Sequence, residues 1–167
     1  AEKFGLDIHK PIILAMGGGQ GLGPLKKIVS SFKKMRIDSQ LVVVAGSNMK
    51  LYGKLKNKIK SSKKKVILCK FVNNIDELME VATVIITKAG GLTTAEALAK
   101  GVPMIIIRPL PGQEEINTTY FLNKGAAVKI TDDTRTSQFI QGLLSNPAML
   151  KAMRNAALRM SKPNASF

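Results

Sequence analysis

Glycine-rich loops are the segments of this chain best suited to chemistry, because they bring backbone N–H groups close to phosphate. One run of glycines covers residues 17–23, after an apolar segment and before a helical pattern. In that setting glycine lets backbone amides approach a pyrophosphate, and the helix dipole favours its charge. The candidate binding residues of this first loop are Gly17, Gly18, Gly19, Gln20 and Gly21.

The first loop departs from two familiar nucleotide-binding patterns. It lacks the Gly-Lys-Ser/Thr ending of the phosphate loop in nucleotide hydrolases. No acid follows the next apolar run, where Ala45-Gly46-Ser47 stands instead, and this disfavours classical NAD binding. A tight turn that needs positive φ is the structural alternative to a binding loop.

A second glycine loop leads into a helix that we expect to begin at Thr93. The amides from Gly91 to Thr94 would then have no partner in the helix, which leaves them for phosphate oxygens. Glu96, in the expected first turn, can accept hydrogen bonds from two ribose hydroxyls, or form a capping box with Thr93. The candidate binding residues here are Gly90, Gly91, Leu92, Thr93, Thr94 and Glu96.

A third loop, residues 108–117, contains two prolines and then presents polar side chains at a helix start. Its candidates are Gln113, Glu114 and Asn117, whose amide and carboxylate groups suit a hydroxyl-rich ligand. His9 is the only histidine and Cys69 the only cysteine, so the sequence indicates neither a metal centre nor a catalytic triad. We therefore expect no metal and no cofactor.

The elements that position these loops alternate between short apolar runs and helical patterns, which is typical of parallel α/β proteins. Strands are expected at 11–16, 40–45, 66–69, within 81–87, at 102–107 and at 126–130. Helices are expected at 24–35, 49–60, 93–100, 115–124, 136–144 and 147–160, with a short one capped by Asn74. The pattern predicts an open, doubly wound, mostly parallel six-stranded sheet, in which ligands bind at the carboxyl ends of strands.

Length and composition favour one compact domain. The chain has 167 residues, 45% hydrophobic and 22% charged, and no apolar run approaches the roughly 20 residues of a membrane span. Residues 1–10 read as an entry segment, 11–160 as the binding domain and 161–167 as a truncated tail. Because the chain starts without methionine and ends without a closing signal, we expect it to be a piece of a longer protein.

Positive charge is concentrated in the first part of the chain. Residues 1–70 carry a net charge of +13 and residues 71–167 one of +2, out of +15 in total. Nine lysines without an intervening acid are Lys50, Lys54, Lys56, Lys58, Lys60, Lys63, Lys64, Lys65 and Lys70. Such a run attracts the phosphates of anionic lipid or of nucleic acid, and a plain solvated face is the alternative. The run contains no arginine to stack on bases, so no specific nucleic acid is expected.

Taken together, the motifs resemble the carboxyl-terminal domain of monogalactosyldiacylglycerol synthases and processive diacylglycerol glucosyltransferases. The resemblance rests on residues 17–23, 71–75, 87–97 and 109–117, and it extends from about Phe4 to Asn164. These enzymes are two-domain glycosyltransferases of the GT-B fold. The N-acetylglucosaminyltransferase of the lipid II pathway is a more distant relative. Ala89 is a departure, because relatives often carry proline before the glycine pair.

The resemblance implies a role for each motif. Phe71 and Val72 would lie beside the uracil ring of a UDP-sugar, although Phe71 as core packing is the alternative. Glu96 would hold the ribose, residues 91–94 the diphosphate, and the polar residues of the third loop the sugar. The activity implied is inverting transfer of a hexose to a lipid acceptor such as diacylglycerol. The general base and the acceptor site are expected in an amino-terminal domain outside this chain, so no catalytic residue is assigned and this piece alone is expected to be inactive.

Partners and location follow from the same comparison. We expect a UDP-sugar, a lipid acceptor bound through the other domain, and an anionic membrane surface, with the protein cytoplasmic or peripheral on a membrane face. Two alternatives remain open. One is a stand-alone nucleotide-sugar-binding subunit that needs a separate acceptor-binding partner. The other is a basic nucleotide- or nucleic-acid-binding module without catalysis.

Overall fold

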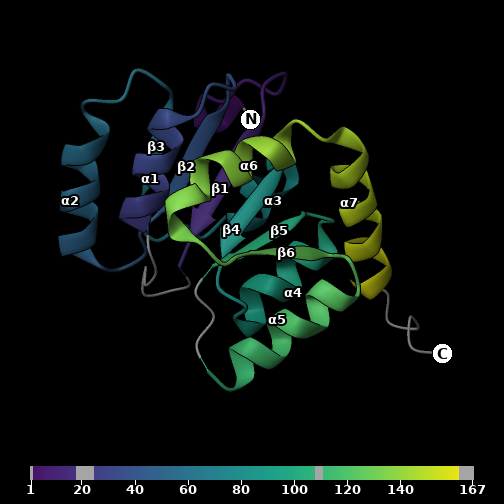
Figure 1. Cartoon of the computed structure of the whole chain (residues 1–167). Helices are drawn as coiled ribbons and strands as arrows, with labels where there is room; N and C mark the ends of the chain where they lie inside the picture. The colour runs from purple at the N-terminus through teal and green to yellow at the C-terminus, as the bar shows by residue number, and fades with distance from the viewer. Residues whose placement is uncertain (1, 18–24, 108–110, 162–167) are drawn as a thin grey trace.

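A parallel sheet of six strands runs through the middle of the molecule, with helices on both of its faces (Figure 1). The computed structural model describes residues 2–17, 25–107 and 111–161. The strands are β1 (Ile12–Met16), β2 (Gln40–Val44), β3 (Val66–Cys69), β4 (Val84–Thr87), β5 (Met104–Ile107) and β6 (Ala127–Ile130). Their order is β3-β2-β1-β4-β5-β6 and every pairing is parallel, so the predicted doubly wound sheet is confirmed.

The strands are apolar along their whole length because helices cover both faces of the sheet. All residues of β1, β2, β4 and β5 are buried, whereas the edge strand β3 is half-buried throughout. The chain runs outward from β1 to β3 and then returns to β4, on the other side of β1. The strand order therefore reverses between β1 and β4, and that switch point is where such sheets bind ligands.

Two layers of helices enclose the sheet. The helical elements are η1 (Glu2–Phe4), α1 (Leu25–Lys34), α2 (Met49–Ile59), α3 (Ile75–Val81), α4 (Gly91–Ala99), α5 (Gln113–Asn123), η2 (Asp133–Arg135), α6 (Thr136–Leu144) and α7 (Pro147–Ser161). Helices α1, α2 and α6 pack on one face, and α3, α4 and α5 on the other. Helix α7 adds Met153 to the first core and Ala156 and Ala157 to the second, so it ties the layers together. None of the described helices has the length and apolar character needed to cross a membrane.

Two helices begin earlier than the sequence pattern predicted. Helix α4 starts at Gly91 rather than Thr93, and α5 starts at Gln113 rather than Glu115. Thr93 is the third residue of α4, so the alternative of a capping box between Thr93 and Glu96 is wrong, and Glu96 lies in the second turn rather than the first.

The predicted cap at Asn74 is also wrong in its chemistry. Asn74 stands at the N-cap position of α3, but its side chain makes no capping hydrogen bond there. Instead, Asn74 Nδ2 donates to Glu77 Oε2 at 3.3 Å. The carboxylate in the first turn has therefore replaced the backbone amide as the partner of this side chain.

Candidate functional site

A cavity of about 300 Å³ opens at the carboxyl ends of β1, β2 and β3, beside the start of α4. It lies next to the switch point, where the sequence predicted a ligand site. The lining residues are Met16, Val44, Gly46, Phe71, Val72, Asn73, Ile75, Leu92, Thr93 and Glu96. We call this space the switch-point cavity.

Five of the predicted binding residues meet in this cavity. They are Phe71, Val72, Leu92, Thr93 and Glu96, and they come from two segments on either side of the switch point. The sequence reasoning missed the other five residues of the wall. Met16, Val44 and Gly46 could have been found from their position at strand ends, whereas Asn73 and Ile75 belong to the 71–75 motif but were given no binding role.

The rim of the cavity is apolar and open. Phe71 is 65% exposed and Leu92 is 76% exposed, although both are large hydrophobic side chains. The alternative interpretation of Phe71 as core packing is therefore wrong. An exposed aromatic ring at a cavity rim offers a π face on which a nucleobase can stack.

The start of α4 supplies backbone donors on the other side. The first N–H groups of a helix have no partner within the helix, which applies here to Gly91, Leu92 and Thr93. The prediction that the amide of Thr94 is also free is wrong, because this N–H donates to Gly90 O at 3.1 Å. Thr94 is buried and its Oγ1 donates to the same oxygen at 2.5 Å, so this residue secures the start of the helix.

Gly90 precedes these donors and shapes the loop. Its own N–H donates to Lys88 O at 2.8 Å, so Gly90 offers no free amide to a phosphate. A Cβ atom placed on Gly90 would meet nothing within 4 Å, which shows that this side of the loop is open. Gly90 therefore leaves room for a ligand beside the loop but donates no hydrogen bond to it.

Glu96 is half-buried and its side chain lines the cavity. Within the described part of the chain, this carboxylate makes no ion pair or hydrogen bond. A carboxylate left with open acceptor sites in a cavity wall can accept hydrogen bonds from two hydroxyl groups of a ligand.

The polar residues at the start of α5 do not line this cavity. Gln113 Nε2 donates to Asn117 Oδ1 at 2.8 Å, and Asn117 Nδ2 donates to Ala89 O at 3.2 Å. Asn117 thus fastens α5 to the loop before α4. The structure brings Asn117 beside the second glycine loop, with Gln113 bonded to it, and none of Gln113, Glu114 and Asn117 lines the cavity.

The first glycine loop is only partly described. Gly17 follows β1 and is half-buried, but it does not line the switch-point cavity. Gly18, Gly19, Gln20 and Gly21 lie outside the described residues. Their predicted contact with phosphate therefore stays a prediction.

No metal centre or activated thiol accompanies these groups in the described ranges. Residues 2–17, 25–107 and 111–161 hold no cluster of three or more His, Cys, Asp or Glu that could bind a metal ion. Burial raises the pKa of the Cys69 thiol, which keeps it protonated near neutral pH and makes it a poor nucleophile.

The lysine-rich segment has more than one role. Lys64 Nζ donates to Ile37 O at 2.9 Å and lies 4.2 Å from the centre of the Phe32 ring. Burial lowers the pKa of Lys64, as expected for an ammonium group held against the protein. Lys65 is exposed and its Nζ donates to Gly5 O, so both lysines also make contacts within the fold.

The fold is that of a Rossmann-like α/β domain, and solved glycosyltransferase structures share it. MurG of Acinetobacter baumannii superposes with a TM-score of 0.76 at 20% identity, covering 93% of this chain and 49% of that one. A glycotransferase of kitacinnamycin gives a TM-score of 0.70 at 22% identity, over 91% and 40% of the two chains. At these identities the likeness establishes the fold.

The family itself is shown by sequence. Residues 12–166 match the glycosyltransferase family 28 C-terminal domain, and the chain belongs to this family. It is 38% identical over 163 residues to proteins named processive diacylglycerol beta-glucosyltransferase from Bacillus thuringiensis and Bacillus cereus. The alignment covers 97% of this chain and 42% of each relative, so the chain spans less than half of their length.

Proposed function

We propose that this chain is the donor-binding domain of an inverting glycosyltransferase that moves a hexose from a UDP-sugar to a lipid acceptor such as diacylglycerol. The observation that carries the proposal is the switch-point cavity, where an exposed aromatic ring faces a carboxylate and helix-start amides that have no partner among the described residues. The ring can stack on a base, the carboxylate can accept hydrogen bonds from a ribose, and the amides can donate to a diphosphate. The names of the curated relatives support a glucosyl donor and diacylglycerol as acceptor.

Each group has a physical role in this proposal. Phe71 stacks on the uracil ring, and the backbone at Val72 reads its edge. Glu96 accepts hydrogen bonds from the two ribose hydroxyls. The amides of Gly91 to Thr93 receive the diphosphate at the positive end of α4. Gln113, Glu114 and Asn117 are proposed to bind the sugar, and the hydrogen bond from Asn117 to Ala89 O supports this for Asn117 by holding it beside the loop.

In the transfer step, the acceptor oxygen attacks the anomeric carbon in line as the bond to the diphosphate breaks. The transition state resembles an oxocarbenium ion, and negative charge grows on the leaving diphosphate. Preorganised amides at the start of α4 stabilise that growing charge, because they need no rearrangement as it forms. The base that takes the acceptor proton is proposed to come from the part of the enzyme that this chain does not include.

We also propose that the outer surface of α1 and α2 associates with an anionic lipid surface. These helices lie side by side (Figure 1), and the charge of Lys54 is the main cause that lowers the pKa of Lys26, with a smaller effect of Lys58. The ammonium groups therefore repel one another in the free protein. Anionic headgroups near this surface would relieve the repulsion, and salt would weaken the attraction.

Calorimetry tests the donor site directly. UDP, ADP and GDP are titrated separately into the chain, and we expect UDP to bind at least tenfold more tightly than the other two. Replacing Phe71 by Ala should weaken UDP binding by roughly 1–3 kcal/mol, the usual contribution of a stacked base, and should leave inorganic pyrophosphate binding unchanged. Equal affinity for all three nucleotides would reduce the site to a general phosphate site and overturn the proposal.

A further inference from the structure

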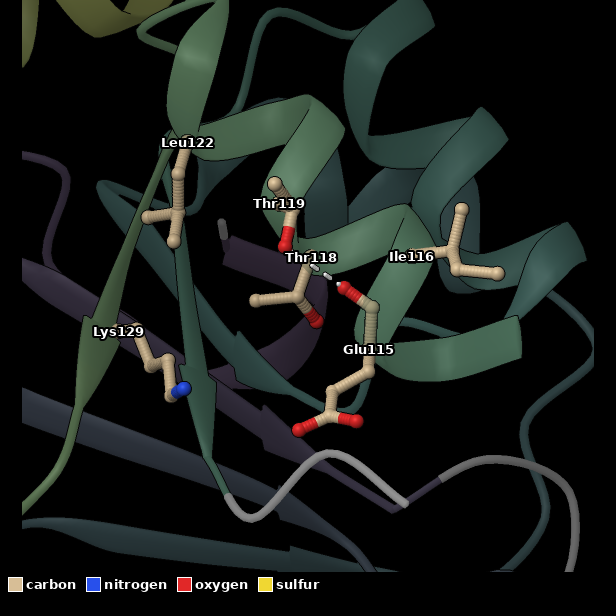
Figure 2. Close-up of a pocket in the computed structure, with 6 residues that line it drawn as sticks. All are labelled: Glu115, Ile116, Thr118, Thr119, Leu122 and Lys129. Atoms are coloured by element: carbon tan, nitrogen blue, oxygen red, sulfur yellow. Dashed lines mark hydrogen bonds between the residues drawn. The ribbon is translucent and has the colours of Figure 1, made fainter. Parts of the chain in front are cut away.

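A second cavity, of about 400 Å³, lies between α5 and β6 (Figure 2). Its lining residues are Glu115, Ile116, Thr118, Thr119, Leu122 and Lys129. Residues 115, 118, 119 and 122 share one face of α5, because they are spaced by three or four positions. Figure 2 shows Lys129 reaching from β6 toward this face, whereas Ile116 points away from Lys129. We call this space the α5–β6 groove.

Two opposite charges line the groove without neutralising each other. Glu115 and Lys129 form no ion pair with each other, and neither side chain has a charged or hydrogen-bonded partner among the described residues. Both groups therefore have their donors and acceptors available to a guest molecule. Because the two charges sum to zero, the groove favours a neutral polar guest over a phosphate.

The remaining wall suits hydroxyl groups as well. Thr118 Oγ1 donates to Glu114 O at 2.6 Å, and Thr119 Oγ1 donates to Glu115 O at 3.0 Å. A hydroxyl that donates to the backbone keeps its lone pairs for accepting. Thr119 is exposed and can use them for a guest, and the exposed Leu122 adds an apolar contact for C–H groups.

The groove runs along α5, from Glu115 in its first turn to Leu122 in its last. Lys129 stands one residue before the carboxyl end of β6, and Glu115 lies in the first turn of α5. Asn117, on another side of α5, is fastened to the loop before α4. Since a helix is about 10–12 Å across with its side chains, a guest in the groove would not overlap a donor held near Asn117.

We propose that the α5–β6 groove binds a neutral sugar ring, the hydroxyl-rich head of a glycosylated lipid. Glu115 accepts hydrogen bonds from its hydroxyls, Lys129 donates to its oxygens, and Leu122 contacts its C–H face. The inference goes beyond the proposed function, because α5 separates the groove from the donor held near Asn117. It adds a sugar-binding site on this domain that is separate from the reacting groups.

The test is a titration of the 15N-labelled chain with n-octyl β-D-glucoside below its micelle concentration, followed by amide chemical shifts. We expect saturable shifts confined to residues 115–122 and 127–130, and no displacement by UDP. The double replacement Glu115→Gln and Lys129→Met should weaken this binding at least tenfold. Lys124→Met, a lysine removed just beyond the same helix, should leave it unchanged. The spectra of the variants also report whether each one is folded.

Three results would overturn the proposal. They are the absence of shifts in the groove, unchanged affinity of the folded double variant, and equal shifts with n-octylphosphocholine, which carries the same tail without a sugar. UDP is titrated into the same sample as an independent measure of the proposed function. Failure of UDP to shift the start of α4, with sugar binding intact, would contradict the donor site and leave the sugar-binding property of the groove standing.

Discussion

Replacing Glu96 by Gln distinguishes a role of this carboxylate in ligand binding from a role in the stability of α4. The structure excludes the capping alternative, since Gly90 is the N-cap residue of α4. Glu96 is the sixth residue of the helix, beyond the first turn where a capping partner would lie. The substitution keeps the size of the side chain and one acceptor oxygen, but it loses the charge. Hydrogen bonds to charged groups contribute roughly 1–3 kcal/mol, so we expect the Kd for UDP to rise between about fivefold and 150-fold.

The assay is calorimetry with UDP and, as a control, with inorganic pyrophosphate, which has no ribose. The affinity for pyrophosphate should not change, because it contacts the amides at the start of α4 and not the carboxylate. Glu77→Gln serves as the matched control variant, since Glu77 is an exposed carboxylate outside the cavity. It should bind UDP as the unchanged chain does.

Unfolding in urea completes the comparison. The stability of Glu96→Gln should stay within about 0.5 kcal/mol of the parent, as for surface substitutions that remove no packing or cap. A destabilised variant with unchanged UDP affinity would refute the ribose assignment. Equal loss of affinity for UDP and pyrophosphate would also refute it, because the carboxylate would then act on the phosphate site.

Three further outcomes are expected. Gly101→Ala should destabilise the fold by roughly 1–3 kcal/mol in urea unfolding, because Gly101 has a φ of 68° and the new Cβ would lie 2.9 Å from Leu158 Cγ. Gly53→Ala should instead stabilise it by about 0.5–1 kcal/mol, since Gly53 lies inside α2 and a Cβ there meets nothing within 4 Å. Replacing Lys54 and Lys58 by Gln should reduce sedimentation with anionic vesicles by about tenfold at low salt. Binding that is the same for neutral vesicles would show that the lysine charges do not drive it.

The strands were predictable because strands covered on both faces are continuous apolar runs, as in Ile12–Met16 and Met104–Ile107. The start of α4 was predicted wrongly because Thr93 looks like a better cap than glycine. In the folded chain, Gly90 O accepts from both the N–H and the Oγ1 of Thr94, an arrangement that local preference does not reveal.

The two cavities differ in how far the sequence could locate them. Phe71 and Glu96 were found from loop position and resemblance, since the carboxyl ends of parallel strands converge at one edge. The α5–β6 groove was not predicted at all. It pairs Lys129 of an edge strand with one face of α5, and which face turns toward the strand is decided by how the helix packs on the sheet.

The strand order gives the uneven charge of the chain a direction in space. Strands β3, β2 and β1 all come from the first 70 residues, which carry a net +13, while β4, β5 and β6 come from the part with +2. The molecule therefore has an electric dipole moment that runs across the strands, from the β6 edge toward the β3 edge. In the field of an anionic surface, the molecule would rotate before contact so that its β3 edge faces the surface. The carboxyl ends of the strands would then point parallel to the surface. An approach in this orientation would leave both cavities open to ligands.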